Sequence, residues 1–181
     1  NGSCNNTTTA VLTIVANPVL QLNNPATVCA PASIDLTAAA ITAGSTPGLS
    51  FTYFTDAAGT ITLSNPSAIT SSGTYYIQGT AASGCKTPVE PVSVTINPLP
   101  VASISYAGSP FCTSGGNATV TQTGQGGGSY SSTSGLTIDP ATGEVNLSAS
   151  TPGTYTVTYT FSNGSCTNTA TTTLTIAPQP V

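Results

Sequence analysis

Hydrophobic and polar residues alternate with a period of two along most of the chain, which is the pattern of half-buried β-strands. In the C-terminal part, the alternation predicts strands at 102–106, 117–121, 135–138, 144–147, 154–159 and 173–176, with a short strand around 129–131. In the central part, it predicts strands at 33–37, 49–54, 60–63, 73–77 and 92–96. No window shows an apolar repeat of 3.6 residues, so we expect an all-β protein.

The last strand of this pattern occurs three times, each time opened by a cysteine and closed by a proline. The cysteines recur every 81 residues and the prolines every 80: Cys4, Cys85 and Cys166, then Pro18, Pro98 and Pro178. A fixed period of this kind indicates a tandem array. We therefore predict three parts: 1–18 as the closing strand of a truncated preceding repeat, and 19–99 and 100–181 as complete repeats.

About seven strands with frequent turns are typical of an immunoglobulin-like β-sandwich, so we expect one such domain in each complete repeat. The joints at 98–100 and 178–180 are rich in proline, which favours short, stiff connections and domains arranged end to end as a rod. Tyr75 and Tyr155 lie 80 residues apart, each after Gly-Thr. We expect both to occupy a core or tyrosine-corner position.

The five cysteines fit the repeats as two pairs and one remainder. Cys29 and Cys112 lie near the start of a complete repeat, whereas Cys85 and Cys166 open its last strand. We predict the disulfides Cys29–Cys85 and Cys112–Cys166, and we expect Cys112→Ser to lower the melting temperature of the third repeat. Cys4 would be half of a disulfide whose partner lies upstream of residue 1. Disulfides imply an oxidising compartment, and the lack of His and of Cys-x-x-Cys argues against zinc.

Charged residues make up 3% of the chain and give a net charge of −4 with a single cation, Lys86. Nucleic acids and anionic membrane surfaces are bound by clustered Lys and Arg, so we expect neither as a partner. No apolar run has the length of a membrane span, so we predict no membrane insertion within this segment. The surface is instead rich in Thr, Ser, Asn and Gly, which suits an exposed extracellular location, and we expect any secretion or anchoring signal to lie outside this stretch.

The residues do not suggest catalysis. With no His and one Lys, the chain lacks the usual proton acceptors of a hydrolytic triad. Asp139 and Glu144 could be a carboxylate pair or a calcium site, but they flank a Pro- and Gly-containing turn, and two carboxylates leave Ca²⁺ short of ligands. The run 124–128 is Gly-rich but lacks the Lys of a phosphate-binding loop. We predict no catalytic, cofactor-binding or metal residue and no cofactor.

Aromatic residues offer a weak alternative. Alternation places Phe51 and Tyr53 on one strand face, where they could form a platform for stacking sugars. Filling the sandwich core is the favoured role, and the lack of Trp argues further against a carbohydrate site. A carbohydrate-binding module would require that glycan binding depend on Tyr53 or Tyr130.

Three segments carry a family resemblance: Ser-Pro-Phe-Cys at 109–112, Gly-Leu-Thr-Ile-Asp-Pro-Ala-Thr-Gly-Glu-Val at 135–145, and Thr-Pro-Gly-Thr-Tyr-Thr-Val at 151–157. They resemble the immunoglobulin-like repeats of giant bacterial surface proteins, in particular gliding-motility adhesins exported by the type IX secretion system. The resemblance is good across 100–181, looser across 19–99, and limited to the closing strand in 1–18. It implies an extracellular, disulfide-bonded stalk that carries adhesive tips or is itself moved along the cell surface. No binding residue is carried over.

Three functions follow from these patterns. The leading hypothesis is a non-catalytic structural and adhesive region of a long bacterial cell-surface protein, whose partners are neighbouring repeats of the same chain and possibly other surface proteins or glycans. The alternative is a self-assembling filament subunit that donates the strand in 1–18 to another chain. The third is a carbohydrate-binding module.

Overall fold

The computed structural model describes residues 16–178, and every named element in that range is a β-strand. Within these residues there is no helix of the length and apolarity needed to span a membrane. The chain divides into two compact units, one formed by 16–27 with 33–95 and the other by 28–32 with 96–178. The repeat boundaries at 19–99 and 100–181 come from the sequence period and stay predictions.

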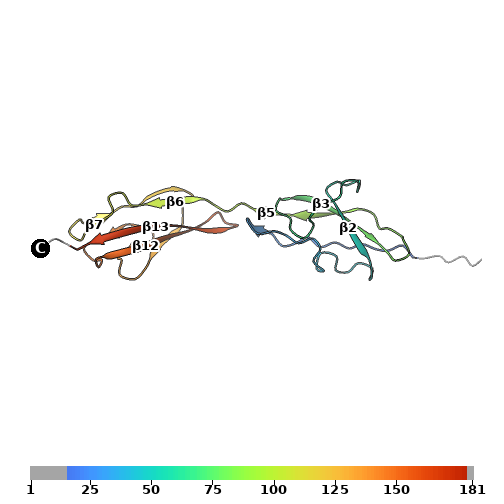
Figure 1. Ribbon diagram of the computed structural model, residues 1–181, viewed down its shortest axis with the longest axis horizontal. Helices are drawn as coiled ribbons and strands as arrows, with labels where there is room; N and C mark the ends of the chain where they lie inside the picture. The colour runs from blue at the N-terminus through green and yellow to red at the C-terminus, as the bar shows by residue number, and fades with distance from the viewer. Residues whose placement is uncertain (1–15, 179–181) are drawn as a thin grey trace, which may run out of the picture. The chain divides into compact units, whose positions relative to one another are not determined.

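The second unit contains a four-stranded sheet with the order β10-β12-β13-β7. Its strands are β10 (Ser129–Ser132), β12 (Gly153–Ser162), β13 (Thr167–Ala177) and β7 (Phe111–Cys112). β13 is antiparallel to β12 and parallel to β7, and Figure 1 shows the two long strands side by side. β12 and β13 pair over ten residues, so their alternation sets which side chains enter the core.

Shorter strands form the other layer of the second unit. β6 (Ala102–Ser105) pairs with β9 (Thr121–Gly124), and β8 (Asn117–Ala118) pairs with β11 (Val145–Asn146), both antiparallel. The enclosed core is apolar and aromatic: Ile104, Tyr106, Ala118, Tyr130, Val145, Leu147, Tyr155, Val157, Tyr159, Phe161, Leu174 and Ile176. The predicted all-β immunoglobulin-like sandwich is confirmed.

Threonine covers the outer face of the long hairpin. Inward positions of β12 are buried tyrosine, valine and phenylalanine, whereas the intervening positions are threonine. Across the hairpin these threonines face threonines of β13 in four directly opposed pairs: Thr154 with Thr175, Thr156 with Thr173, Thr158 with Thr171 and Thr160 with Thr169. Threonine has high β propensity and a hydroxyl that water can solvate, so this face favours the strand without presenting an apolar surface.

The first unit is built on the antiparallel sheet β2-β3-β4. These strands are β2 (Ser50–Phe54), β3 (Gly73–Thr80) and β4 (Glu90–Val94). Its buried apolar side chains are Ile34, Leu36, Ile41, Phe54, Ile69, Ile77, Val92 and Val94. Gly79 in β3 is required by packing, because a Cβ there would lie 2.8 Å from the side chain of Leu49.

Several predicted strands are shorter than the alternation suggests. The strands at 33–37, 60–63 and 135–138 are reduced to isolated bridges, which pair Ile34 with Ile69, Phe54 with Thr62 and Ile138 with Val145. In the first unit, carboxylates compete for the backbone: Asp35 accepts from the Thr37 amide at 2.7 Å, and Asp56 accepts from the Ile61 amide at 2.7 Å. Such local bonds favour turns over a continuous ladder.

Two strands of only two residues were not predicted. β1 (Val28–Cys29) runs parallel to β5 (Ile96–Asn97), as β7 runs parallel to β13. A two-residue strand is too short for alternation to reveal, and its partner is remote in the sequence. These strands place Cys29 and Cys112 in the fold.

Stability should decline in acid because three exposed carboxylates are hydrogen-bonded in the folded state. Hydrogen bonds from nearby backbone and hydroxyl groups lower the pKa of Asp35, Asp56 and Asp139 below the ordinary value of 3.8. A lowered folded-state pKa contributes stability that is present above the unfolded-state pKa and is lost as the pH falls through the folded-state value. We expect urea midpoints to be constant between about pH 5 and 8 and to fall below about pH 4. Asp56→Asn should weaken the acid dependence, and an unchanged pH profile in this variant would contradict the assignment.

Candidate functional site

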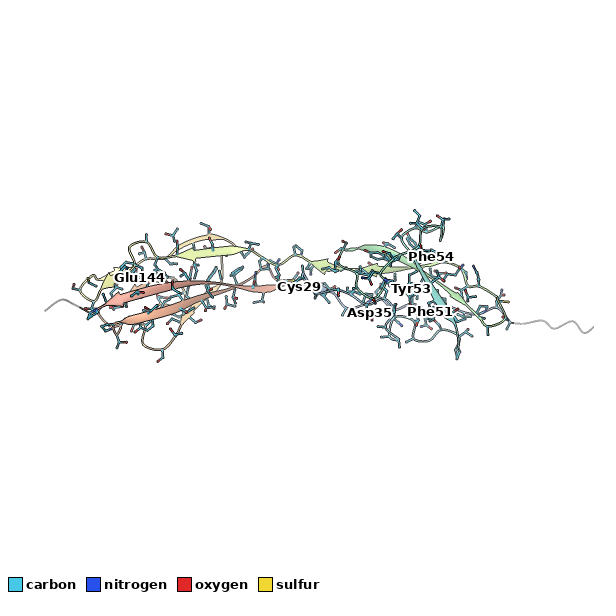
Figure 2. The ribbon with its side chains drawn as sticks, viewed as in Figure 1. Cys29, Asp35, Phe51, Tyr53, Phe54 and Glu144 are labelled. Carbon is cyan, nitrogen blue, oxygen red and sulfur yellow. A yellow bond between two sulfur atoms is a disulfide. The ribbon has the colours of Figure 1, made fainter. Side chains whose placement is uncertain are left out.

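The cysteines are the chemically distinctive residues of the chain. Cys29 and Cys166 form a disulfide with a Cα–Cα distance of 5.9 Å, and Figure 2 labels Cys29 at this place. Cys85 and Cys112 are free thiols, half-buried and exposed respectively. The predicted pairs Cys29–Cys85 and Cys112–Cys166 are therefore corrected to the single pair Cys29–Cys166. Cys4 lies outside the described residues, so its predicted upstream partner stays a prediction.

The register of β13 explains why the predicted Cys112–Cys166 pair does not form. β7 places Cys112 opposite Ala177, the last residue of β13, whereas Cys166 immediately precedes Thr167, the first. Eleven residues of strand separate the two ends, about 35 Å at roughly 3.3 Å per residue. Because a disulfide needs Cα atoms within about 7 Å, Cys112 and Cys166 cannot bond within one domain.

The turn before β13 holds Cys166 in place. The Asn163 side chain accepts hydrogen bonds from the amides of Ser165 and Cys166 at 3.1 and 2.8 Å, and it donates to the Pro98 carbonyl at 3.2 Å. The Ser162 hydroxyl donates to the Cys166 carbonyl at 2.9 Å. Sequence reasoning missed this role of Asn163, although the dipeptide Asn-Gly at 163–164 is a recognised turn signal.

The carboxylates Asp139 and Glu144 belong to a turn. Asp139 accepts from the amides of Ala141 and Thr142 at 2.7 and 3.1 Å, and Glu144 accepts from the Asn117 side-chain amide at 2.6 Å. Figure 2 labels Glu144 in the second unit. Within the described residues, no group of three or more Cys, Asp or Glu is placed to hold a metal ion.

The aromatic residues proposed for sugar stacking have different environments. Phe51 and Tyr53 are half-buried on β2, while Phe54 is buried. Burial raises the pKa of Tyr53, and the negative charge of Asp35 raises it further; Figure 2 labels both residues. Tyr130 is buried and stacks on Tyr159 with ring centroids 4.6 Å apart. Tyr130 is thus a core residue, which leaves Tyr53 as the partly accessible candidate.

The remaining surface features are shallow. One hollow of about 170 Å³ includes Leu63, Ile69 and Tyr75, and another of about 240 Å³ lies beside Gly127 and Gly128 at the end of the Gly-rich run. The Gly128 amide donates to the Tyr159 hydroxyl at 3.0 Å, so this end of the run is bound to the core. Neither hollow gathers charged side chains, so neither suggests a reaction.

The predicted tyrosine corners are confirmed in both units. The Tyr75 hydroxyl donates to the Ser71 carbonyl at 3.0 Å, and the Tyr155 hydroxyl donates to the Thr151 carbonyl at 2.6 Å, each four residues upstream. This bond fixes the chain as it enters the sixth strand of an immunoglobulin-like sandwich.

Removing the Tyr155 hydroxyl should destabilise the second unit. In Tyr155→Phe the Thr151 carbonyl loses its donor, and we expect a loss of about 1–1.5 kcal/mol in the free energy of unfolding, measured by urea titration. Tyr76→Phe is the matched control, because the described residues include no hydrogen-bond partner for the half-buried Tyr76 hydroxyl. Equal effects of the two substitutions would contradict a special role for the corner.

Comparisons with known proteins agree with this fold. Residues 16–98 match the family model described as "Ig-like domain CHU_C associated". The titin domains z1z2, solved in complex with telethonin, are similar at 14% identity and a TM-score of 0.36, over 93% of this chain and 100% of that one. Four N-terminal Ig domains of Dscam1 isoform 6.9 are similar at 16% identity and a TM-score of 0.32, over 93% of this chain and 48% of theirs.

A bacterial structure is also similar. It is a SusE-like surface located polysaccharide binding protein from the Bacteroides thetaiotaomicron heparin utilisation locus, at 13% identity and a TM-score of 0.39. The match covers 84% of this chain and 32% of that one. The search of curated proteins finds no match. The family match and the sheet topology together make this an all-β chain of immunoglobulin-like fold, whose residues 16–98 are similar to the CHU_C-associated Ig-like domains.

Proposed function

We propose that this chain is a non-catalytic structural and adhesive region of a bacterial cell-surface protein. The observation that carries the proposal is the recurrence of one design in both sequence repeats. Each repeat has a two-residue parallel strand ending in a cysteine, in register with the end of the last strand, and each has a tyrosine corner. Repetition of a whole domain, rather than of a binding residue, suits a protein that provides reach and surface area.

Two further features support an extracellular location. The Cys29–Cys166 disulfide is of a kind that persists in oxidising environments. The low charge of 3% leaves a surface dominated by hydroxyl and amide groups, whose hydration changes little with salt or pH. The similarity of 16–98 to CHU_C-associated Ig-like domains is consistent with this proposal.

Strand donation is the less favoured alternative. A donated strand needs a vacant place in the acceptor sheet. In the second unit, β13 pairs with β12 on one side and with β7 on the other, and in the first unit β4 pairs with β3. The place of the last strand is therefore occupied in both units, which speaks against an acceptor role for either.

The finer proposal is a stalk of the gliding-motility adhesin type, exported by the type IX system and possessing adhesive partners at the cell surface. It is supported by the resemblance of 109–112, 135–145 and 151–157 to such repeats. If the stalk is itself moved, fluorescent antibody fragments bound to living cells should travel along the cell surface. Antibody fragments that stay at fixed positions on gliding cells would contradict the motility proposal but leave a static adhesin stalk.

Labelling of whole cells tests the surface location. An antibody raised against this chain should label intact cells of the producing bacterium, and brief protease treatment should remove the label. A cytoplasmic protein probed on the same cells is the control for leakage. Labelling that appears only after permeabilisation would overturn the proposal.

A further inference from the structure

The free thiol of Cys112 occupies the same structural position as the bonded Cys29. Each is the second residue of a two-residue strand that runs parallel to the end of a last strand. Val28 and Phe111 pair with an isoleucine, and the cysteine that follows pairs with the next residue: Cys29 with Asn97 and Cys112 with Ala177. The two cysteines are therefore equivalent in register, although one is bonded and the other is exposed.

The free thiol of Cys85 is equivalent to the bonded Cys166 in the same way. Each immediately precedes the first residue that pairs back across the turn: Lys86 bridges to Thr80, and Thr167 pairs with Ser162. The backbone closes both turns at this cysteine, since the Ala81 amide donates to the Cys85 carbonyl at 2.9 Å and the Asn163 amide donates to the Cys166 carbonyl at 3.2 Å.

We propose that Cys112 and Cys85 are complementary half-sites of the disulfide that Cys29 and Cys166 already make. Cys112 bonds the turn cysteine of another immunoglobulin-like repeat of this kind, and Cys85 bonds the short-strand cysteine of another. The bonded pair is separated by 137 residues, and a cysteine that far after Cys112 or before Cys85 would lie outside this sequence. The bond thus links repeats to one another, because the two cysteines of one repeat lie at opposite ends of its last strand.

The bond-forming step is an oxidation by thiol–disulfide exchange. Two thiols lose two protons and two electrons and form one S–S bond, while a small disulfide such as oxidised glutathione is reduced to two thiols. The exposure of Cys112 makes it accessible to the exchange, and Cys85 is half-buried, as Cys29 is in the existing bond.

A second copy of this chain supplies both half-sites and serves as the probe. The test uses two variants that also carry Cys4→Ser, one with Cys85→Ser and the other with Cys112→Ser. Each keeps the Cys29–Cys166 bond and one of the two thiols. The first is labelled with ¹⁵N, the two are mixed at equal, high concentration in a glutathione redox buffer, and the products are measured by intact mass.

Complementary half-sites should give mainly the labelled–unlabelled dimer. We expect this heterodimer to exceed each homodimer by about tenfold, which a preference of about 1.4 kcal/mol produces, against about twofold for random pairing. Peptic digestion should then recover a Cys85–Cys112 peptide that joins a labelled to an unlabelled chain. The Cys4→Ser chain, which has both thiols, should form a ladder of head-to-tail oligomers.

Random chemistry is measured with a matched control. Thr171 is exposed on β13, so Thr171→Cys in a background lacking Cys4, Cys85 and Cys112 provides an accessible thiol without the proposed complement. Mixed with the Cys112→Ser variant, it should give statistical dimers. A statistical ratio for Cys85 with Cys112, no heterodimer, or a Cys85–Cys112 bond within one monomer would each overturn the proposal. These outcomes leave the surface-labelling test unaffected, because the inference depends on the equivalence of the repeats alone.

Discussion

Cys166→Ser is expected to lower the free energy of unfolding of the second unit by about 4–5 kcal/mol, because the Cys29–Cys166 bond closes a segment of 137 residues. The chain-entropy relation assigns a loop of that length about 5 kcal/mol. Cys166 is 2% exposed, so the serine hydroxyl would also be buried. Urea titration followed by circular dichroism measures the loss.

Three controls separate the bond from the side chain. Reduction of the unsubstituted protein should destabilise it by a similar amount, and reduction should have no further effect on Cys166→Ser. Cys112→Ser should leave the melting temperature unchanged, because Cys112 is exposed and unbonded in the described structure, which replaces the effect first expected for this substitution. A loss in Cys112→Ser with none in Cys166→Ser would restore pairing within each repeat.

Tyr159→Ala is expected to cost about 3–5 kcal/mol, the usual range for removing a large buried side chain. Tyr159 is 2% exposed, and its ring lies between Tyr130 and Phe161 with centroid distances of 4.6 and 5.2 Å. Its hydroxyl donates to the Gln125 carbonyl at 3.1 Å and accepts from the Gly128 amide at 3.0 Å. The substitution therefore removes core volume, ring stacking and the attachment of the Gly-rich loop.

A graded series tests which of these contributions dominates. Tyr159→Phe keeps the ring but leaves two backbone groups without their partner, so we expect a loss of about 1–2 kcal/mol. Val101→Ala, at an exposed position, should change stability by less than about 0.5 kcal/mol. If Tyr159→Phe were as damaging as Tyr159→Ala, the hydrogen bonds to the loop, and not the packing of the ring, would be the main contribution.

The long strands could be predicted because their signal is local. In β12 and β13, threonine alternates with large apolar residues over much of the hairpin, and only a sheet with one buried face explains that period. The tyrosine corners were predictable for a related reason, since Tyr75 and Tyr155 recur at the repeat spacing within the same short motif. The turn at Asp139 was predicted correctly from Pro140 and Gly143, whose backbone preferences act within a few residues.

Short elements and the disulfide were not predictable in this way. The strands at 33–37 and 60–63 have the right alternation, but the carboxylates of Asp35 and Asp56 bind nearby amides and break the ladder, and such competition is decided by side-chain geometry. The parallel strands β1 and β7 depend on partners that are remote in the sequence, so no local pattern announces them.

The cysteines show most clearly where local pattern ends and tertiary structure begins. Their spacing was sufficient to predict repeats, an oxidising compartment and an unpaired remainder, because periodicity and count are properties of the chain itself. Which thiols meet depended on the register of Cys112 beside Ala177, at the far end of the strand that Cys166 precedes. A disulfide requires sulfur atoms within bonding distance in space, and only the folded sheet determines which cysteines share an end.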